Sequence, residues 1–467
     1  MEEIKDLQLQ LKNGFDEFND SIIHISGNGL FLDENSMTFI TNLSFHNCIF
    51  TGTHLEFENI DRPEFRLGFF DCEFQISLDI KNCNFIRLGF RDVKSKKSIH
   101  ISGGNYKNLF FRNNNLEAKG KNLLTGKISI ENLNITEKVE LDYINHSNGV
   151  FDFSNNNLSN SDGEENDKVI TFENSTFENI NFRKNQFFKD ASFKEMEIKG
   201  KCYFEECDFD KVNFSNLTIG GLRFVDCKFF KTAVFHYILG NISSYISFES
   251  CLFEKYIQFN GTNSSTFGVI DVEFSKIVSF QETEFDTVLI DRTIFEKGAL
   301  FDDINIKNIE KCDRRTIRII KRELVNSHNQ IDYLRFKAYE LNAYKKEGGK
   351  NWKDNLVLFF NEQSNYFGLD WLRGVMFTIV TSFILYLLYL ISFVISIKSL
   401  ELLPPDLETF FVKYLKFVNP LSFLKPPILQ AENYFFPLFI LIIGKIFVSF
   451  GIYQTIQAFR KFGVNGG

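Results

Sequence analysis

Residues 202–229 read CYFEECDFDKVNFSNLTIGGLRFVDCKF, and a large apolar residue returns in this stretch at every fifth position. The recurring residues are Phe204, Phe209, Phe214, Ile219, Phe224 and Phe229. A period of five fits neither an α-helix, whose period is about 3.6, nor a simple strand, whose period is about 2. It indicates a chain that turns a corner every five residues. The recurring residue and the one two places before it then point inward, while the other three face water.

The same period occurs in two further stretches. Its members there are Phe172, Phe177, Phe182 and Phe187, and then Phe280, Phe285, Ile290 and Phe295. Four such sides make a coil of about 20 residues, and coils stack at the inter-strand spacing of roughly 4.8 Å. The pattern resembles that of the pentapeptide-repeat family, which implies a right-handed quadrilateral β-helix. We therefore predict a degenerate β-solenoid of about thirteen coils over residues 35–310, preceded by an N-terminal segment at residues 1–34.

The composition fits a solenoid with an aromatic interior. The chain contains 57 phenylalanines, and we predict that those at the recurring positions stack on one another. Most of the eight cysteines stand two places before a phenylalanine, which predicts small buried apolar residues. The sequence lacks the paired CxxC motif of zinc sites, so we expect reduced thiols and neither metal nor cofactor.

The carboxyl-terminal third differs in character from the rest of the chain. Residues 374–397 carry no formal charge, and residues 434–459 are interrupted only by Lys445. Apolar helices of this length cross a bilayer. We predict a transmembrane domain at 356–467 with spans at about 372–397 and 434–459, and an outer re-entrant-like segment at 400–433.

Basic residues indicate the orientation of this domain. Lys345, Lys346, Lys350, Lys353 and Arg373 precede the first span, and Arg460 and Lys461 follow the second. The amino terminus is acidic and lacks the apolar core of a signal peptide. The positive-inside rule then places both termini in the cytoplasm.

Residues 311–355 have a helical pattern and are rich in basic side chains, which predicts an amphipathic linker helix. Its seam alternates spacings of three and four through Ile317, Ile320, Leu324, Ser327, Ile331, Leu334, Ala338 and Leu341. Two interpretations are open. The seam either associates subunits around an axis or packs on the end of the solenoid.

The second span carries a polar stripe. Lys445, Ser449, Tyr453 and Gln457 follow one another at steps of four. In one interpretation, copies of this helix line an aqueous pore, and Lys445 forms a positive ring. In the other, Lys445 snorkels or pairs with a carboxylate such as Glu432. The layout resembles tetrameric two-helix ion channels, but the potassium filter TVGYG is absent, so potassium selectivity is not implied.

A second repeat in the sequence predicts which residues lie on the outer surface of the solenoid. RLGF occurs at 66–69 and again at 87–90, a separation of one coil, and a further step of 21 reaches Leu109 and Phe111. Three outward columns follow. They hold Arg66, Arg87 and Asn108; Gly68, Gly89 and Phe110; and Phe70, Arg91 and Arg112, with Lys94, Lys96 and Lys97 in the adjoining loop.

Stacked arginines repel one another, and a polyanion would relieve that repulsion. Arginines beside exposed phenylalanines suit single-stranded nucleic acid, with phosphates on the guanidinium groups and bases on the rings. The alternative is a solvated face whose charges are neutralised by Asp71 and Asp92. The patch stands out because residues 1–310 carry a net charge of −16 and residues 311–467 one of +8.

The chain resembles membrane effectors of the Hailong anti-phage defence system. The resemblance rests on the combined architecture, on the ending GIYQTIQAFRKFG at 451–463 and on the patch formed by the arginines of the three columns. The resemblance implies a homotetrameric channel in the bacterial inner membrane. It also implies a partner nucleotidyltransferase whose single-stranded DNA product binds the cytoplasmic domain and holds the channel shut. We thus expect a ligand-gated channel effector that arrests growth on opening.

Two other function classes compete with a channel. An acidic pentapeptide rod can imitate duplex DNA, so a membrane-tethered scaffold or DNA mimic without conductance is the alternative function. An enzyme is not expected, because the sequence lacks HExxH, GxSxG, Walker and GxGxxG arrangements and its seven histidines are scattered.

Overall fold

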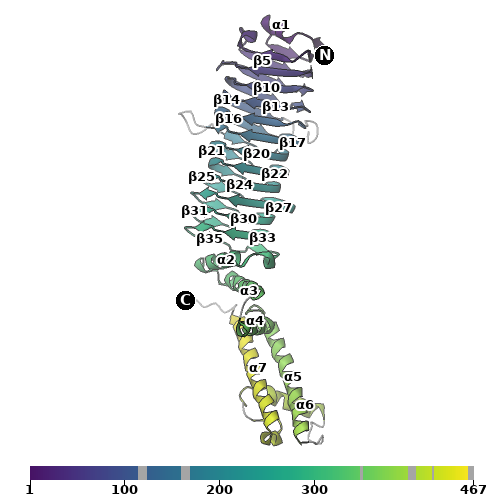
Figure 1. Cartoon of the computed structure of the whole chain (residues 1–467), viewed down its shortest axis with the longest axis vertical. Helices are drawn as coiled ribbons and strands as arrows, with labels where there is room; N and C mark the ends of the chain where they lie inside the picture. The colour runs from purple at the N-terminus through teal and green to yellow at the C-terminus, as the bar shows by residue number, and fades with distance from the viewer. Residues whose placement is uncertain (114–123, 159–168, 348–350, 398–405, 423–424, 461–467) are drawn as a thin grey trace. The chain divides into compact units, whose positions relative to one another are not determined.

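The computed structural model describes residues 1–113, 124–158, 169–347, 351–397, 406–422 and 425–460. The chain divides into two compact units, Met1–Cys312 and Asp313–Gly467 (Figure 1). The first unit is built almost wholly of short strands, and the second is helical.

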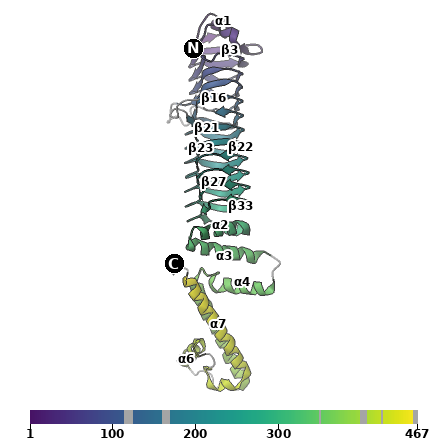
Figure 2. The same cartoon turned by 90° about the vertical axis from the view of Figure 1, so that its left-hand side faces the viewer.

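The first unit is a β-solenoid of about 13 turns over residues 2–306. Figure 2 shows its strands stacked one above another. Every strand pairing among the described residues is parallel, and Leu67 pairs with Leu88, so the two RLGF stretches lie side by side. The expected fold class is therefore confirmed. The separation between these two stretches is one turn of the solenoid.

The strands form three sets of hydrogen-bonded neighbours. One set of thirteen strands is β4 (Leu30–Leu32), β7 (His54–Glu58), β10 (Ser77–Lys81), β13 (Ile99–Ser102), β15 (Ile128–Glu131), β17 (Asn145–Ser154), β20 (Thr176–Arg183), β22 (Glu197–Glu205), β24 (Thr218–Val225), β27 (Leu239–Glu249), β30 (Asn263–Ile270), β33 (Glu284–Asp291) and β36 (Asn305–Ile306). A shorter set at the amino-terminal end is β1 (Glu2–Ile4), β3 (Ser21–Ile25), β6 (Ile49–Gly52), β9 (Glu73–Phe74) and β12 (Lys94–Ser95).

The third set contains the strands that carry the arginine columns. It consists of β2 (Glu17–Asn19), β5 (Asn42–His46), β8 (Arg66–Phe70), β11 (Phe85–Arg91), β14 (Asn105–Arg112), β16 (Asn134–Asp142), β18 (Asn157–Leu158), β19 (Val169–Thr171), β21 (Gln186–Ser192), β23 (Asp208–Asn213), β25 (Lys228–Phe229), β26 (Ala233–Val234), β28 (Leu252–Phe253), β29 (Ile257–Gln258), β31 (Glu273–Phe274), β32 (Val278–Ser279), β34 (Ile294–Phe295) and β35 (Ala299–Leu300). Short helical segments accompany the strands at α1 (Leu7–Lys12), η1 (Glu34–Met37) and η2 (Ile309–Lys311).

Stacked phenylalanines fill the interior, as predicted. Phe182, Phe204, Phe224 and Phe248 lie ring on ring, with successive centroids 4.5, 4.7 and 4.9 Å apart. The rings recur at one position of each turn, so the parallel register places each ring directly over the previous one. All eight cysteines are buried and unbridged, which confirms their prediction as small interior residues.

The amino-terminal boundary differs from the expected one. Residues 1–34 are not a separate segment, because β1 pairs with β3 and β4 pairs with β7 in the solenoid. Ile23 and Leu32 of the first turns are in register with Phe50 and Phe57, so this end buries aliphatic side chains where the following turn buries phenylalanine. The five-residue pattern is thus hidden at this end, although the fold continues.

The second unit contains six α-helices in its described residues. They are α2 (Arg314–Asn326), α3 (Gln330–Lys346), α4 (Trp352–Asn365), α5 (Trp371–Ile397), α6 (Leu407–Val418) and α7 (Phe435–Phe459), with a short η3 (Leu429–Asn433) before α7. The two longest, α5 and α7, are long and apolar enough to cross a membrane by length and composition. Their bounds match the predicted spans to within a residue.

The segment between the two long helices contains α6 and η3. It corresponds to the re-entrant-like segment predicted at 400–433, of which 400–405 and 423–424 lie outside the described residues. Lys350 and Lys461, two of the basic residues used to orient the spans, also lie outside them.

The predicted linker helix at 311–355 is divided into α2, α3 and the start of α4. Helix α2 ends at Asn326, and His328 adopts a left-handed backbone conformation with φ of 59°. The α2 and α3 helices pack against each other. Ile331, a member of the expected seam, is 61% exposed. The heptad pattern is therefore interrupted by a turn, which sequence spacing alone does not reveal.

Helices α5 and α7 pack closely where small residues face hydroxyl-bearing ones. A Cβ added at Gly451 would lie 2.1 Å from the Thr378 hydroxyl oxygen, and one at Gly374 would lie 2.8 Å from that of Thr455. Such contacts between small residues let helix backbones approach each other in an apolar environment.

Candidate anion-binding groove

The arginine columns lie on strands β8, β11 and β14, which run side by side. Arg66 is paired in register with Arg87, and Arg87 with Asn108. Gly68, Gly89 and Phe110 form the next column, and Phe70, Arg91 and Arg112 the third. The three columns predicted from the repeat of RLGF are therefore confirmed.

Alternation along the strands turns these residues outward. Leu67, Leu88 and Leu109 are at most 1% exposed and fill the interior. Residues two apart on a strand share a face, so Arg87, Gly89 and Arg91 of β11 are all on its outer side, where the two arginines are exposed and Gly89 itself is buried. Arg87 and Arg91 thus flank a position without a side chain.

The surface between them is a groove of about 380 Å³. Its lining includes all four arginines and both outward phenylalanines, and it comprises Asn42, Ser44, Arg66, Leu67, Gly68, Phe70, Arg87, Gly89, Phe90, Arg91, Phe110, Arg112 and Glu140. A volume of this size falls within the range of about 300–1,000 Å³ that is typical of ligand sites.

The two glycines have different surroundings. A Cβ added at Gly68 would lie 2.6 Å from the Phe70 ring, so this ring covers Gly68. A Cβ added at Gly89 would meet no atom within 4 Å. The open floor of the groove is therefore at Gly89.

Both outward rings already carry a guanidinium group. The Cζ atom of Arg87 lies 4.5 Å from the centroid of the Phe110 ring, and that of Arg91 lies 4.6 Å from the Phe70 ring. His46 stacks on Phe70, at a centroid distance of 4.6 Å. Each arginine is thereby held in place on an aromatic surface, which orders its donors without neutralising its charge.

The charges of the groove are poorly compensated. Arg112 has the Glu140 carboxylate at 3.9 Å, and Glu140 also lies 2.5 Å from the amine of Lys138. Within the described residues, no carboxylate lies within 4.0 Å of the guanidinium nitrogens of Arg66, Arg87 or Arg91. Asp71 and Asp92, the expected neutralising residues, occupy left-handed backbone positions with φ of 54° and 58°.

The structure separates three predicted lysines from this groove. Lys94 lies in β12, which belongs to a different set of strands and pairs with Glu73 of β9. Lys96 and Lys97 follow it, and none of the three contributes to the groove lining.

Sequence reasoning missed three residues that line the groove, Asn42, Ser44 and Glu140. They belong to neighbouring turns that are longer than the turn between the two RLGF stretches. Asn42 pairs with Arg66, and Phe110 pairs with Glu140. A fixed step along the sequence therefore does not reach them.

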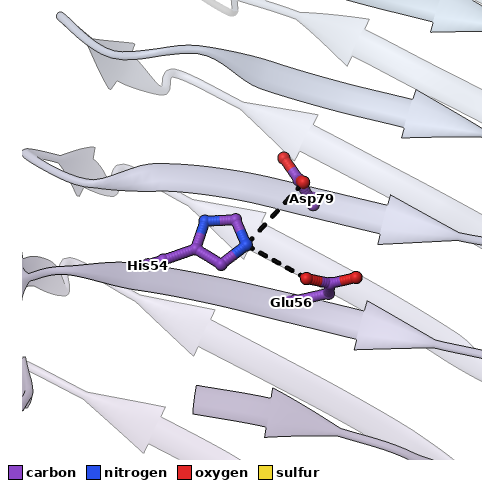
Figure 3. A group of neighbouring side chains, drawn as sticks. All are labelled: His54, Glu56 and Asp79. Atoms are coloured by element: carbon purple, nitrogen blue, oxygen red, sulfur yellow. Dashed lines mark hydrogen bonds and ion pairs between the residues drawn. The ribbon is translucent and has the colours of Figure 1, made fainter. Parts of the chain in front are cut away.

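A second polar cluster lies on β7 and β10 (Figure 3). His54 Nε2 is 3.1 Å from Glu56 and 3.7 Å from Asp79. Imidazole and carboxylate donors at this spacing match a divalent metal site in geometry. The amine of Lys81, however, lies 2.8 Å from Glu56 and 3.1 Å from Asp79. Lys81 thus supplies the positive charge that a metal ion would bring.

The ionisation of this cluster follows from these contacts. Burial opposes the charge on Glu56, but hydrogen bonds from Lys81 and His54 outweigh it and lower the pKa of Glu56. The hydrogen bond to Glu56 and a second one to Asp79 raise the pKa of Lys81. Both groups are therefore held in their charged forms.

In the helical unit, Lys445 is buried inside the chain rather than exposed on a stripe. Its amine donates to the backbone carbonyl oxygens of Lys416 and Asn419, at 3.1 and 2.5 Å, and lies 3.3 Å from the Ser422 hydroxyl. These carbonyls stand at the carboxyl-terminal end of α6, where a cation is favoured by the helix dipole. Neither snorkelling nor pairing with Glu432 describes this arrangement.

The other members of the predicted stripe face outward from the chain. Ser449, Tyr453 and Gln457 are exposed on α7. The neighbouring Gln454 is buried and accepts from the Asn365 side chain at 2.6 Å. The structure therefore does not keep Lys445 together with Ser449 and Tyr453.

Comparison of the chain with protein-family models, with curated proteins and with solved structures finds no match.

Proposed function

We propose that this protein is a ligand-gated oligomeric membrane channel whose solenoid senses a single-stranded nucleic acid or nucleotide signal. The observation that carries the proposal is the groove, where three arginines without an ion pair to any described residue surround an open glycine floor. The rest of the solenoid sequence is acidic, so an uncompensated cationic groove there points to an anionic ligand.

The chemistry of the groove favours a nucleotide over a simple anion. Arg87 and Arg91 hold their guanidinium groups on aromatic rings at opposite sides of Gly89, and each offers planar donors suited to phosphate oxygens. The floor at Gly89 leaves room for a planar base to lie between them. Bases stack readily on aromatic rings and on guanidinium planes.

The membrane part of the proposal rests on α5 and α7, which are long and apolar enough to cross a bilayer. Two helices of one chain do not enclose a pore, so conduction requires several copies, and we propose a homotetramer in the bacterial inner membrane. Because Lys445 is buried against α6, we assign it the role of holding α6 against α7. Ser449 and Tyr453, which are exposed, are the candidates for lining a shared path.

Anti-phage defence is the setting that we propose for such a channel. A partner nucleotidyltransferase would supply the oligonucleotide, and loss of that ligand would alter ion flux and arrest growth. Ion movement through a multi-copy assembly would couple the signal to the membrane potential.

The sensor is tested by oligonucleotide binding to the full chain in detergent. Reversing two charges with Arg87→Glu and Arg91→Glu should weaken binding by about 100-fold or more, because each charged hydrogen bond contributes about 1.5–3 kcal/mol. The matched control is Arg183→Glu with Lys184→Glu, which makes the same charge change on exposed residues of another turn. Equal weakening in both variants would show that only net charge matters and would refute the groove as the site.

Ionic strength gives a second measure of the same site. The logarithm of the binding constant should fall with the logarithm of salt concentration, by roughly 0.7 for each phosphate neutralised on a single strand. In the doubly reversed variant, this slope should be less steep by the contribution of about two phosphates. An unchanged slope would contradict direct phosphate contact.

The channel is tested by ion flux from liposomes that contain the protein. We expect flux whose rate changes when the oligonucleotide is added to the solenoid side. Absence of flux under every condition, together with oligonucleotide binding, would instead favour a membrane-tethered scaffold without conductance. The acidic solenoid, which is compatible with duplex DNA mimicry, is the observation behind that second candidate.

A further inference from the structure

Helix α4 has its polar and apolar sides arranged opposite to those of a helix on a water-soluble surface. Its polar side chains Asn361 and Asn365 face α7, where Asn365 donates to the Gln454 carbonyl at 2.9 Å and Gln454 donates to Asn361 at 3.1 Å. Asn365 and Gln454 are almost wholly buried. The amide groups of Asn361 and Asn365 are thus turned inward, whereas Gln363, between them in the sequence, is exposed.

Large apolar groups are nevertheless exposed on α4. Trp352 is 69% exposed, Leu356 48% and Phe359 47%, all on the side away from Asn361, and Val357, one turn before Asn361, is 59% exposed. A helix in contact with water on one side normally presents polar residues there. An apolar outer side with a polar inner side indicates an apolar medium or partner outside the helix.

A recess of about 250 Å³ continues this apolar side onto α7. It is lined by residues of α4 and α7, all apolar apart from one asparagine: Leu356, Val357, Phe360, Asn361, Ile446, Phe447 and Phe450. Ile446 is itself 56% exposed on α7. The exposed side of α4 and the outer surface of the proposed span therefore form one continuous apolar surface.

The tryptophans of the chain mark the same region. The chain has two, Trp352 at the start of α4 and Trp371 at the start of α5, and both are exposed. The Lys353 amine lies 6.0 Å from the centroid of the Trp352 ring, and the Arg373 guanidinium carbon lies 5.7 Å from the Tyr366 ring. Amphipathic aromatic rings beside basic groups are typical of the boundary between lipid headgroups and acyl chains.

We infer that α4 is an interfacial helix embedded in the membrane surface, with phospholipid acyl chains against its outer apolar side and one chain in the recess beside α7. This inference rests on the proposed membrane location of α5 and α7. The basic groups next to Trp352 and Tyr366 would contact headgroup phosphates. A phospholipid fits better than a second protein copy, because the apolar side is bordered by this pairing of aromatic and basic groups.

The two tryptophans permit a direct test in the full chain. The variant Trp371→Phe leaves Trp352 as the sole tryptophan, and Trp352→Phe leaves Trp371. Each variant is reconstituted in bilayers of phospholipids brominated either near the headgroup or deep in the acyl chain, and tryptophan quenching is measured. We expect both tryptophans to be quenched, with Trp352 quenched more strongly by the shallow bromines than by the deep ones.

The two ways in which this test can fail are distinguishable. Quenching of Trp371 without quenching of Trp352 would overturn the placement of α4 while leaving the membrane spans intact, and it would point to water or a second copy on this side. Quenching of neither tryptophan would overturn the membrane location itself, and with it the inference. Either result is obtained without any measurement of conductance or ligand binding.

A matched pair of variants tests the recess. Val357→Glu places a carboxylate at its edge, whereas Asn355→Glu places one on an exposed position of the same helix that does not line it. With Trp352 as the sole tryptophan, Val357→Glu should reduce quenching by brominated lipid, and Asn355→Glu should not. Equal effects of the two substitutions would contradict an acyl chain in the recess.

Discussion

Two outer surfaces of the same solenoid turns differ in whether their charged side chains are paired. On β7 and β10, Glu56, Asp79, His54 and Lys81 lie within hydrogen-bonding or ion-pair distance of one another. On β8 and β11, Arg66 stands in register with Arg87, and neither has an ion-pair partner among the described residues. The strands of both surfaces are paired by the same parallel register, so the fold does not account for the difference.

The β7–β10 charges are paired with one another within the solenoid, whereas the β8–β11 arginines are the charges that we propose for ligand binding. The β7–β10 cluster is nearly closed, because the side chain of Glu56 is only 8% exposed. The groove is open, and its arginines rest on aromatic rings instead of carboxylates. Removing one member of a buried ion pair lowers the stability of the fold, because the remaining charge is left without its partner. Removing one of two like charges that have no partner does not carry this cost. Substitutions in the cluster should therefore affect stability, and substitutions in the groove should affect binding.

The largest effect on stability is expected at Glu56. Glu56→Ala removes the carboxylate between Lys81 and His54 and should destabilise the protein by about 2 kcal/mol, because Lys81 and His54 each lose one of two carboxylate partners while Asp79 remains. Thermal or denaturant unfolding of the full chain measures the change. Glu64→Ala, at an exposed position between β7 and β8, should change stability by less than about 0.5 kcal/mol. Oligonucleotide binding should be the same in both variants.

The next effect concerns the floor of the groove. Gly89→Val fills the space where we propose that a base lies, and it should weaken oligonucleotide binding by about 10-fold, which corresponds to the loss of one stacked base. Gly268→Val is the matched control, because a Cβ at Gly268 meets only the Ser247 Cβ, at 3.8 Å. An abasic oligomer should bind both variants and the unaltered protein equally. Preferential loss of abasic binding in Gly89→Val would argue against a base at this position.

A smaller effect is expected from pH. The pKa of Glu56 is lower in the folded protein than in the unfolded chain, where it is about 4.3. The ionised carboxylate therefore contributes stability above about pH 4.3, and this contribution is lost as the pH falls through the lower folded pKa. Glu56→Gln should be less stable than the unaltered protein at pH 7, by about 1 kcal/mol, and the gap should close in acid. A gap that is constant with pH would show that ionisation is not responsible.

The smallest effect is expected at Arg66. Arg66→Ala removes one of two like charges in register, so stability should stay the same or rise by up to about 0.5 kcal/mol. Unfolding measured in low and high salt checks the cause, because screening should abolish any gain. A clear loss of stability would mean that the arginine is structural, and the contrast between the two surfaces would fail.

Much of the groove could be predicted from the sequence, because a parallel solenoid converts sequence separation directly into spatial position. Once Leu67 and Leu88 are identified as interior residues, the positions of Arg66, Gly68 and their partners one turn away follow. The prediction ends where the turn length changes. Phe110 pairs directly with Glu140 across a longer turn, so Glu140 was not expected at the end of the groove.

Other features depend on partners that spacing does not reveal. The sequence places Lys445 beside water or a carboxylate, but the structure shows its amine hydrogen-bonded to backbone carbonyls at the end of α6. Every residue has a backbone carbonyl, so the pattern of residue types cannot indicate which ones a lysine will meet. The turn after Asn326 could not be predicted from residue spacing, because the apolar seam continues through it. The cluster of His54 and Asp79 requires the register between β7 and β10, and the turn that joins these strands is longer than the one between the two RLGF stretches.

The stacked turns also determine how far the effect of a ligand can travel. In the described residues, the strands of each turn pair with strands of the turns before and after it, so the energetics of the solenoid approach those of a one-dimensional array with nearest-neighbour coupling. A ligand that lies across β8, β11 and β14 would join three successive turns, and amide hydrogen exchange should slow in these strands and fade within a few turns on either side. In such an array, a signal reaches the distant end through displacement of the whole stack, since local stabilisation decays along it.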